Sequence, residues 1–176
     1  MRKWTFLVAI SMFGMLGGCG KPGDAAQDSV ETPFNPARCL VGLEVTAGDG
    51  VKMPAGACVT SPNKAFALVM QPSGALEVLP VAPNGSPGKP LWTTGSRGPG
   101  PGEALGLFQS DGNLVVYSRR NDAWLWNSGS TTPVTDYRLD VTDQGELVIR
   151  LSKGGAAWSS RSGLATPSPA AKAPAS

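Results

Sequence analysis

The stretch QSDGNLVVY, residues 109–117, has a two-residue period that indicates a β-strand. Leu114 and Val116 occupy one face, which is apolar and is expected to be buried. The alternate positions carry carboxamide, carboxylate, valine and phenol side chains, which belong to Gln109, Asp111, Asn113, Val115 and Tyr117. Burying these polar groups without partners would cost too much free energy. They are therefore expected to project side by side into a shallow trough open to water.

Two other segments have the same pattern, ALVMQPSGALEVL (67–79) and LDVTDQGELVIR (139–150). In each of the three segments a glycine is followed two places later by leucine, at Gly74 and Leu76, Gly112 and Leu114, and Gly145 and Leu147. Each segment is closed by a tryptophan signature, LWTTGS, LWNSGS or AWSSRS, and the tryptophans are 34 and 32 residues apart. The sequence therefore predicts one supersecondary unit repeated three times around a shared core.

The middle unit is interpreted as LGLFQ, a turn at SDGN, and then the strands NLVVYS and AWLWNS. Three such sheets around a pseudo-threefold axis would pack Trp92, Trp126 and Trp158 near the centre. Trp124 lies outside the repeated register. It is either a surface platform or an edge contact, and the pattern does not decide between them.

Composition narrows the possible chemistry. The chain of 176 residues has 23 glycines, 16 prolines and no histidine. It therefore favours short strands and turns, and it excludes histidine metal sites and Ser-His-Asp or Cys-His catalysis. No metal and no cofactor is expected. Without Arg2 and Lys3 the chain has 13 basic and 13 acidic residues, and the basic ones are scattered. The pair Arg119–Arg120 is interpreted as a solvated turn, and no nucleic acid partner is expected.

The N-terminus has the pattern of a secretory leader, residues 1–18, with basic residues followed by an apolar run too short to span a bilayer. Its end, Leu16-Gly17-Gly18-Cys19, resembles the lipobox of bacterial lipoproteins. That resemblance implies cleavage before Cys19, acylation of Cys19 and anchoring in a lipid bilayer. Gly20, where an aspartate usually means inner-membrane retention, favours the outer membrane of the bacterial envelope.

The remaining chain divides into a flexible tether (19–38), one domain (39–162) and a disordered Ala/Pro/Ser-rich tail (163–176). In an oxidising compartment Cys39 and Cys58 favour one disulfide over two buried free thiols. Two cysteines without histidine provide too few ligands for a metal site.

Residues 109–117 match the motif Q-x-D-x-N-x-V-x-Y at every fixed place, and residues 42–162 resemble the bulb-type mannose-binding lectins of monocots, which also occur in bacteria. The resemblance implies an all-β fold, the β-prism II, with three four-stranded sheets. It also implies binding of α-D-mannose without a metal. Asp111 and Asn113 would contact the axial O2, Gln109 would contact O3, Tyr117 would contact O4, and Val115 would pack on the sugar ring.

The other two repeats depart from the motif. The first repeat (71–79) keeps Gln71, but the other four positions are Ser73, Ala75, Glu77 and Leu79. The third repeat (142–150) keeps Val148, and its other positions are Thr142, Gln144, Glu146 and Arg150. The first is expected to have lost sugar binding. The third is polar but wrongly shaped for mannose, and binding of another sugar, an acidic one for instance, or of nothing stays open.

These observations predict a membrane-anchored lectin that is not an enzyme and binds mannose or mannose-containing glycans. The alternatives are a protein-interaction or structural module of the envelope and a lectin-like antibacterial protein. A glycoside hydrolase would need a carboxylate pair, for which Asp140 with Asp143, or Asp111 with Asp122, are the candidates. The pattern specifies no oligomeric state.

Overall fold

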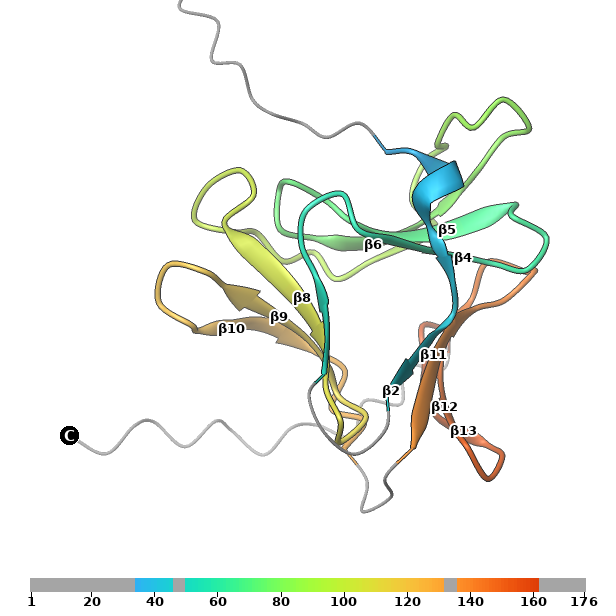
Figure 1. Ribbon diagram of the computed structural model, residues 1–176. Helices are drawn as coiled ribbons and strands as arrows, with labels where there is room; N and C mark the ends of the chain where they lie inside the picture. The colour runs from blue at the N-terminus through green and yellow to red at the C-terminus, as the bar shows by residue number, and fades with distance from the viewer. Residues whose placement is uncertain (1–33, 46–49, 132–135, 162–176) are drawn as a thin grey trace, which may run out of the picture.

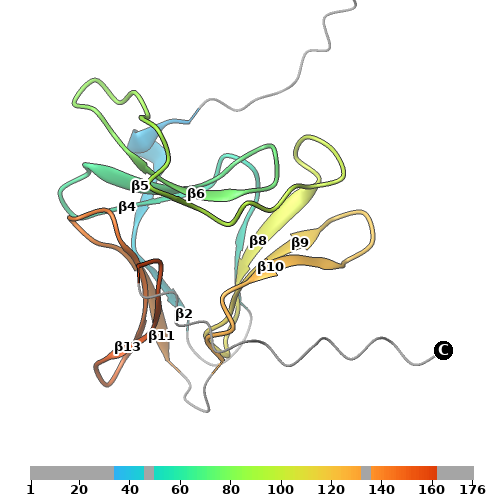
Figure 2. The same cartoon turned by 180° about the vertical axis from the view of Figure 1, so that it is seen from behind.

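The computed structural model describes residues 34–45, 50–131 and 136–161. The predicted leader (1–18), Cys19 and the predicted tail (163–176) lie outside these residues. Three β-sheets stand around a common axis (Figure 1), and the same arrangement is seen from behind in Figure 2. A short 3-10 helix, η1 (Pro36–Arg38), precedes the strands. None of the helical structure in the described ranges is long and apolar enough to cross a membrane.

Each repeat supplies most of one sheet. The first sheet has the order β1-β4-β5-β6-β7, with strands Leu40–Val41, Cys58–Thr60, Phe66–Met70, Leu76–Pro80 and Trp92–Thr93. The second has the order β10-β9-β8-β3, with strands Trp124–Asn127, Leu114–Ser118, Ala104–Phe108 and Val51–Met53. The third has the order β13-β12-β11-β2, with strands Ala156–Ser159, Leu147–Leu151, Tyr137–Val141 and Leu43–Val45.

This arrangement is the predicted β-prism II, with one correction. The first sheet has five strands rather than four, because β1 pairs in parallel with β4. The other pairs of strands within the three sheets are antiparallel. The N-terminal segment thus contributes β1 to the first sheet, β2 to the third and β3 to the second before β4 returns to the first.

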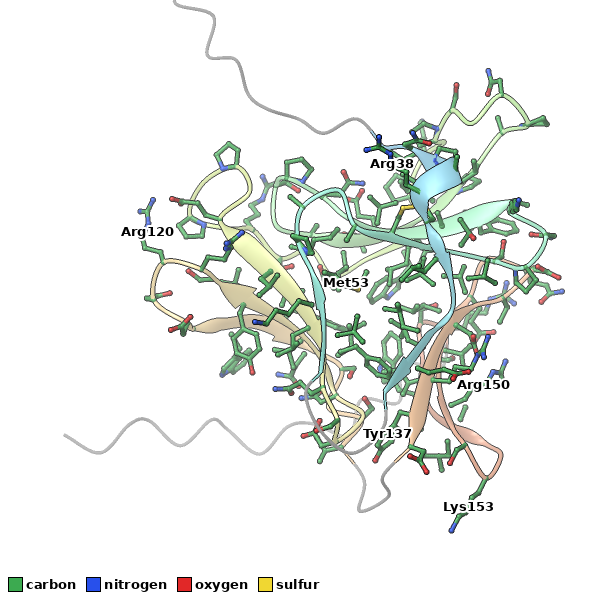
Figure 3. The ribbon with its side chains drawn as sticks, in the orientation of Figure 1. Arg38, Met53, Arg120, Tyr137, Arg150 and Lys153 are labelled. Carbon is green, nitrogen blue, oxygen red and sulfur yellow. A yellow bond between two sulfur atoms is a disulfide. The ribbon has the colours of Figure 1, made fainter. Side chains whose placement is uncertain are left out.

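The three repeated tryptophans meet at the centre, as predicted. The ring centroids of Trp92, Trp126 and Trp158 are 5.6 to 6.0 Å apart, and the rings are inclined at 70 to 74°. Such edge-to-face contacts stabilise aromatic pairs beyond the area that they bury. Leu114 and Val116 are fully buried in the same core, and so the expected apolar face of the central strand is confirmed. Met53 and Tyr137, labelled in Figure 3, also fill this interior.

The repeated glycines join the three units into a closed ring. Gly112 has a φ of +83°, and a Cβ there would run into the Tyr137 ring, at the start of the third repeat. A Cβ on Gly145 would lie 2.7 Å from Cδ1 of Phe66, at the start of the first repeat. A Cβ on Gly74 would lie 3.1 Å from Cβ of Ala104, at the start of the second. Glycine is required at these turns because each turn packs against the next repeat.

The outer face of the first sheet is covered by the N-terminal segment. Cys39 and Cys58 form the predicted disulfide. Phe34 and Cys39 pack on a second apolar cluster, which consists of Cys58, Ala67, Val69 and Leu79. The packed domain therefore includes residues 34–38, which the sequence assigned to the tether. The correction has a simple cause, because Phe34 buries apolar surface on the sheet.

Candidate functional site

The motif spans a tight turn between two strands. β8 ends at Phe108, β9 begins at Leu114, and the backbone N–H of Gln109 donates to the carbonyl of Asn113 (2.9 Å). Gln109 therefore lies opposite Asn113 across the hairpin turn. The two residues do not follow one another along a single strand. The expectation of five side chains in one row is wrong in this respect. The hairpin nevertheless keeps the motif on the second sheet, from the turn at Asp111 to Tyr117 near the end of β9.

Asp111 stands in the turn and is exposed. Its Oδ1 accepts a hydrogen bond from the backbone N–H of Asn113 (3.0 Å), which is the usual contact of an Asx turn. Its Oδ2 accepts a longer bond from the Thr131 hydroxyl (3.4 Å). The carboxylate is thus held in place but retains acceptor capacity toward solvent.

Asn113 is oriented by the segment that follows the core tryptophan. Its Oδ1 accepts hydrogen bonds from the Ser128 hydroxyl and from the backbone N–H of Gly129, both at 3.0 Å. Ser128 Oγ in turn accepts from the backbone N–H of Leu114 (2.9 Å). With Oδ1 occupied in this way, Asn113 presents its Nδ2 as a donor, for which the described residues provide no hydrogen-bond acceptor.

Gln109 and Tyr117 are connected across the face, since Gln109 Nε2 donates to Tyr117 Oη (3.3 Å). Val115 lies between Asn113 and Tyr117 along β9, and its cross-strand partners are Leu107 in β8 and Asn127 in β10. Val115 is only 2% exposed. The apolar patch expected from the sequence is therefore buried between the neighbouring strands.

Sequence reasoning missed several members of this face. Ser128 and Thr131, which hold Asn113 and Asp111, belong to the segment SGS and its continuation. The recurrence of TGS, SGS and SRS after each tryptophan was the available signal, and in the first repeat Thr94 Oγ1 accepts from Leu76 N just as Ser128 does from Leu114. Trp124 also lies here, directly opposite Tyr117 in β9.

The first repeat has no comparable face. Its positions equivalent to Asn113 and Tyr117 are Ala75 and Leu79, which are 5% and 4% exposed. Leu79 belongs to the apolar cluster beneath Phe34 and Cys39. The loss of sugar-binding groups expected from the sequence thus coincides with burial under the N-terminal segment.

The third repeat presents a network of ion pairs. Asp140 bonds Arg138 at 2.6 Å and Arg150 at 3.4 Å, and Arg138 also bonds Glu44 at 2.6 Å. The hydrogen bond and the negative charge of Asp140 raise the pKa of the Arg138 guanidinium. Figure 3 shows Arg150 on the outer side of this sheet. Asp140 is thus shared between two arginines, and the Arg150 side chain remains about half exposed.

Two carboxylate pairs had been candidates for hydrolysis. Asp111 and Asp122 stand in turns at opposite ends of β9, whose five residues span roughly 17 Å. Paired glycosidase carboxylates lie within about 10 Å of each other. Asp140 is in the ion-pair network, and Asp143 Oδ1 accepts from the backbone N–H of Asn63 (2.9 Å). These four acids therefore have structural partners or are too far apart.

Several solved structures with a similar architecture are lectins. The domain is similar to monomeric monocot mannose-binding lectins of Gastrodia elata, with a TM-score of 0.54, 24% identity, and coverage of 68% of this chain and 96% of that one. A Marasmius oreades lectin matches with a TM-score of 0.55 and 18% identity over 72% and 98% of the two chains. The Polygonatum cyrtonema lectin, whose structure contains a monomannoside, matches with a TM-score of 0.51 and 20% identity. The match covers 64% of this chain and 90% of that one.

No family model matches this chain, and no curated protein matches it by sequence. At these identities the likeness concerns the fold. The chain has the β-prism II fold of the bulb-type lectins. Its three sheets correspond to the three repeats of the sequence.

Proposed function

We propose that the protein is a non-enzymatic lectin that binds mannose or mannose-containing glycans on the outer face of the second sheet. The residues are those of the motif, Gln109, Asp111, Asn113, Val115 and Tyr117. The observation that carries the proposal is the fixed orientation of Asn113. Two protein donors hold its Oδ1, so that its Nδ2 and the exposed Asp111 carboxylate offer a donor and an acceptor side by side.

This pair suits a sugar hydroxyl, which donates one hydrogen bond and accepts others. An axial O2 would donate to Asp111 and accept from Asn113. Gln109 and Tyr117 would exchange their mutual bond for bonds to the neighbouring hydroxyls, and Val115 would meet the C–H face of the ring through the small surface that it exposes. An epimer with O2 elsewhere would leave these polar groups unpaired, which weakens binding.

The proposal includes an anchor. Acylated Cys19 would hold the protein on the bacterial envelope, at the outer membrane, with the domain displayed on a short tether. The one intact motif in the chain supports only a weak single contact, and many anchored copies on one membrane would then supply avidity.

The test is calorimetric titration of the purified protein with methyl α-mannoside, with methyl α-glucoside as the sugar whose O2 is equatorial. We expect saturable binding of the mannoside only. Asp111→Asn and Tyr117→Ala should weaken it about ten- to a hundredfold, as expected for loss of a hydrogen bond to a charged group or of a ring contact. Gln144→Asn, at the equivalent position of the third repeat, is the matched control and should bind normally.

Absence of heat at high millimolar mannoside in a folded protein would overturn the proposal. It would favour a protein-interaction or structural module of the envelope instead. That alternative is supported by the first and third faces, one of which is covered and the other filled by ion pairs.

A further inference from the structure

Trp124 is the large exposed aromatic residue of the described chain. Its exposed fraction is 50%, whereas the three repeated tryptophans are buried or half-buried around the axis. Single exposed apolar side chains are common and need no explanation. The position of Trp124 is what distinguishes it, because it pairs with Tyr117 across β9 and β10. Directly opposed residues in antiparallel strands share a face, so the indole lies beside the proposed mannose site.

A β-bulge places it there. Trp124 pairs with Tyr117, but Trp126 pairs with Val116, and the register shifts between them at Leu125. In a regular strand, residues 124 and 126 would point to the same side. The bulge sends Trp126 into the core and Trp124 onto the outer face.

The other repeats provide an internal comparison. The third sheet has the same bulge, and there Arg150, at the Tyr117 position, pairs with Ala156. Ala156 is therefore the equivalent of Trp124, and it stands in a repeat without the motif. In the first repeat the residue two places before the core tryptophan is Pro90. The aromatic platform thus accompanies the one repeat whose motif is intact.

We propose that Trp124 forms a second subsite, in which its ring stacks on the C–H face of a hexose linked to the mannose held by the motif. This inference rests on the proposed function and adds to it a second contact, made by Trp124 to a hexose linked to the bound mannose. Aromatic rings suit this role because a pyranose presents an apolar C–H face. Tyr117 joins the two subsites, since it belongs to the motif and is the cross-strand neighbour of Trp124.

The experiment compares methyl α-mannoside with the mannobioses linked through O2, O3 and O6, titrated into the purified full-length chain. We expect at least one mannobiose to bind about two- to tenfold more tightly than the monosaccharide, the gain typical of one aromatic contact. Trp124→Ala should abolish this gain and leave affinity for methyl α-mannoside within about twofold. Trp124→Phe should retain part of the gain.

Leu40→Ala is the matched control, because Leu40 is 57% exposed and lies on the first sheet. It should change neither affinity. A second readout is tryptophan fluorescence, in which the mannobiose should shield the protein from iodide quenching, and this shielding should disappear in Trp124→Phe.

The inference is overturned if no mannobiose binds more tightly than the monosaccharide, or if the gain persists in Trp124→Ala. It is also overturned if folded Trp124→Ala loses the monosaccharide as well, because Trp124 would then belong to the first site. Failure of the wild type to bind methyl α-mannoside would instead defeat the proposed function, and the inference with it.

Discussion

The outer faces of the first and second sheets have equivalent backbone turns, but one face is covered by the N-terminal segment and the other is open. Both sheets have a glycine in the turn and a leucine two places later. In both, a side-chain hydroxyl accepts a hydrogen bond from the backbone N–H of that leucine. On the second sheet the outer face carries Asp111 and Tyr117 and is open. On the first sheet the equivalent of Tyr117 is Leu79, which packs beneath Phe34 and the disulfide.

The difference shows that the fold and the site are separable in this molecule. The apolar inner faces maintain the prism, and each repeat supplies one core tryptophan and one turn glycine. The outer faces are free to diverge, because they contribute little to the shared core. One has become a buried contact for the N-terminal segment, one an ion-pair network, and one retains the motif.

Truncation of Leu79 should give the largest effect on this comparison. Leu79→Ala removes a buried side chain from the cluster on the first sheet and should lower the free energy of unfolding by about 3 kcal/mol. Tyr117→Ala, at the equivalent and partly exposed position, should cost under about 1 kcal/mol. Urea denaturation measures both. Equal losses would mean that the N-terminal cover contributes no packing.

Removal of the disulfide comes next. The bridge closes a loop with a sequence separation of 19, and the paired substitution Cys39→Ser with Cys58→Ser should cost about 3 kcal/mol or less. Affinity for methyl α-mannoside should be unchanged, because the bridge lies on the first sheet. A parallel loss of sugar binding, measured in the same folded sample, would contradict the independence of the two faces.

Transfer of the motif would test whether openness alone distinguishes the faces. On the third sheet the variant combines Thr142→Gln, Gln144→Asp, Glu146→Asn and Arg150→Tyr. We expect its calorimetric stoichiometry to rise from one site to two, since Val148 is already present and the face is uncovered.

On the first sheet the corresponding variant combines Ser73→Asp, Ala75→Asn, Glu77→Val and Leu79→Tyr. The stoichiometry of this variant should stay at one site, and its free energy of unfolding should fall. A second binding site on this sheet would contradict the covering role of Phe34.

The smallest effect is expected from the ion pairs. Glu44 is largely exposed, and Glu44→Gln should lower the free energy of unfolding by about 0.5 kcal/mol at low salt and by less at high salt. Glu103→Gln breaks the pair with Arg120 at the rim of the second sheet and should behave alike. Arg120 stands at the end of that sheet in Figure 3. A loss above about 2 kcal/mol for Glu44→Gln would make the third face a stabilising element in its own right.

The sequence predicts the prism, the central tryptophans, the disulfide and the glycine turns, because each is repeated locally or encoded by residue type. It does not predict the parallel strand β1 or the cover of Phe34, since both depend on where a distant segment returns. The sequence also does not predict the burial of Val115, because this depends on Leu107 and Asn127, which lie beside it on the neighbouring strands. Trp124 could not be assigned because a bulge of one residue reverses its face.

The N-terminal segment has a consequence for the order in which the molecule folds. β2 can pair only with β11, where Leu43 meets Leu139, and β3 waits for β8. A chain synthesised from its N-terminus therefore holds β2 without its partner until residues 137–139 have been made, whereas β1 can pair with β4 early. Closing such a long loop costs conformational entropy before the strand pair contributes any stability, and this slows folding. The strands β2 and β3 thus complete the third and second sheets late, and together with β1 they tie one short segment into all three sheets.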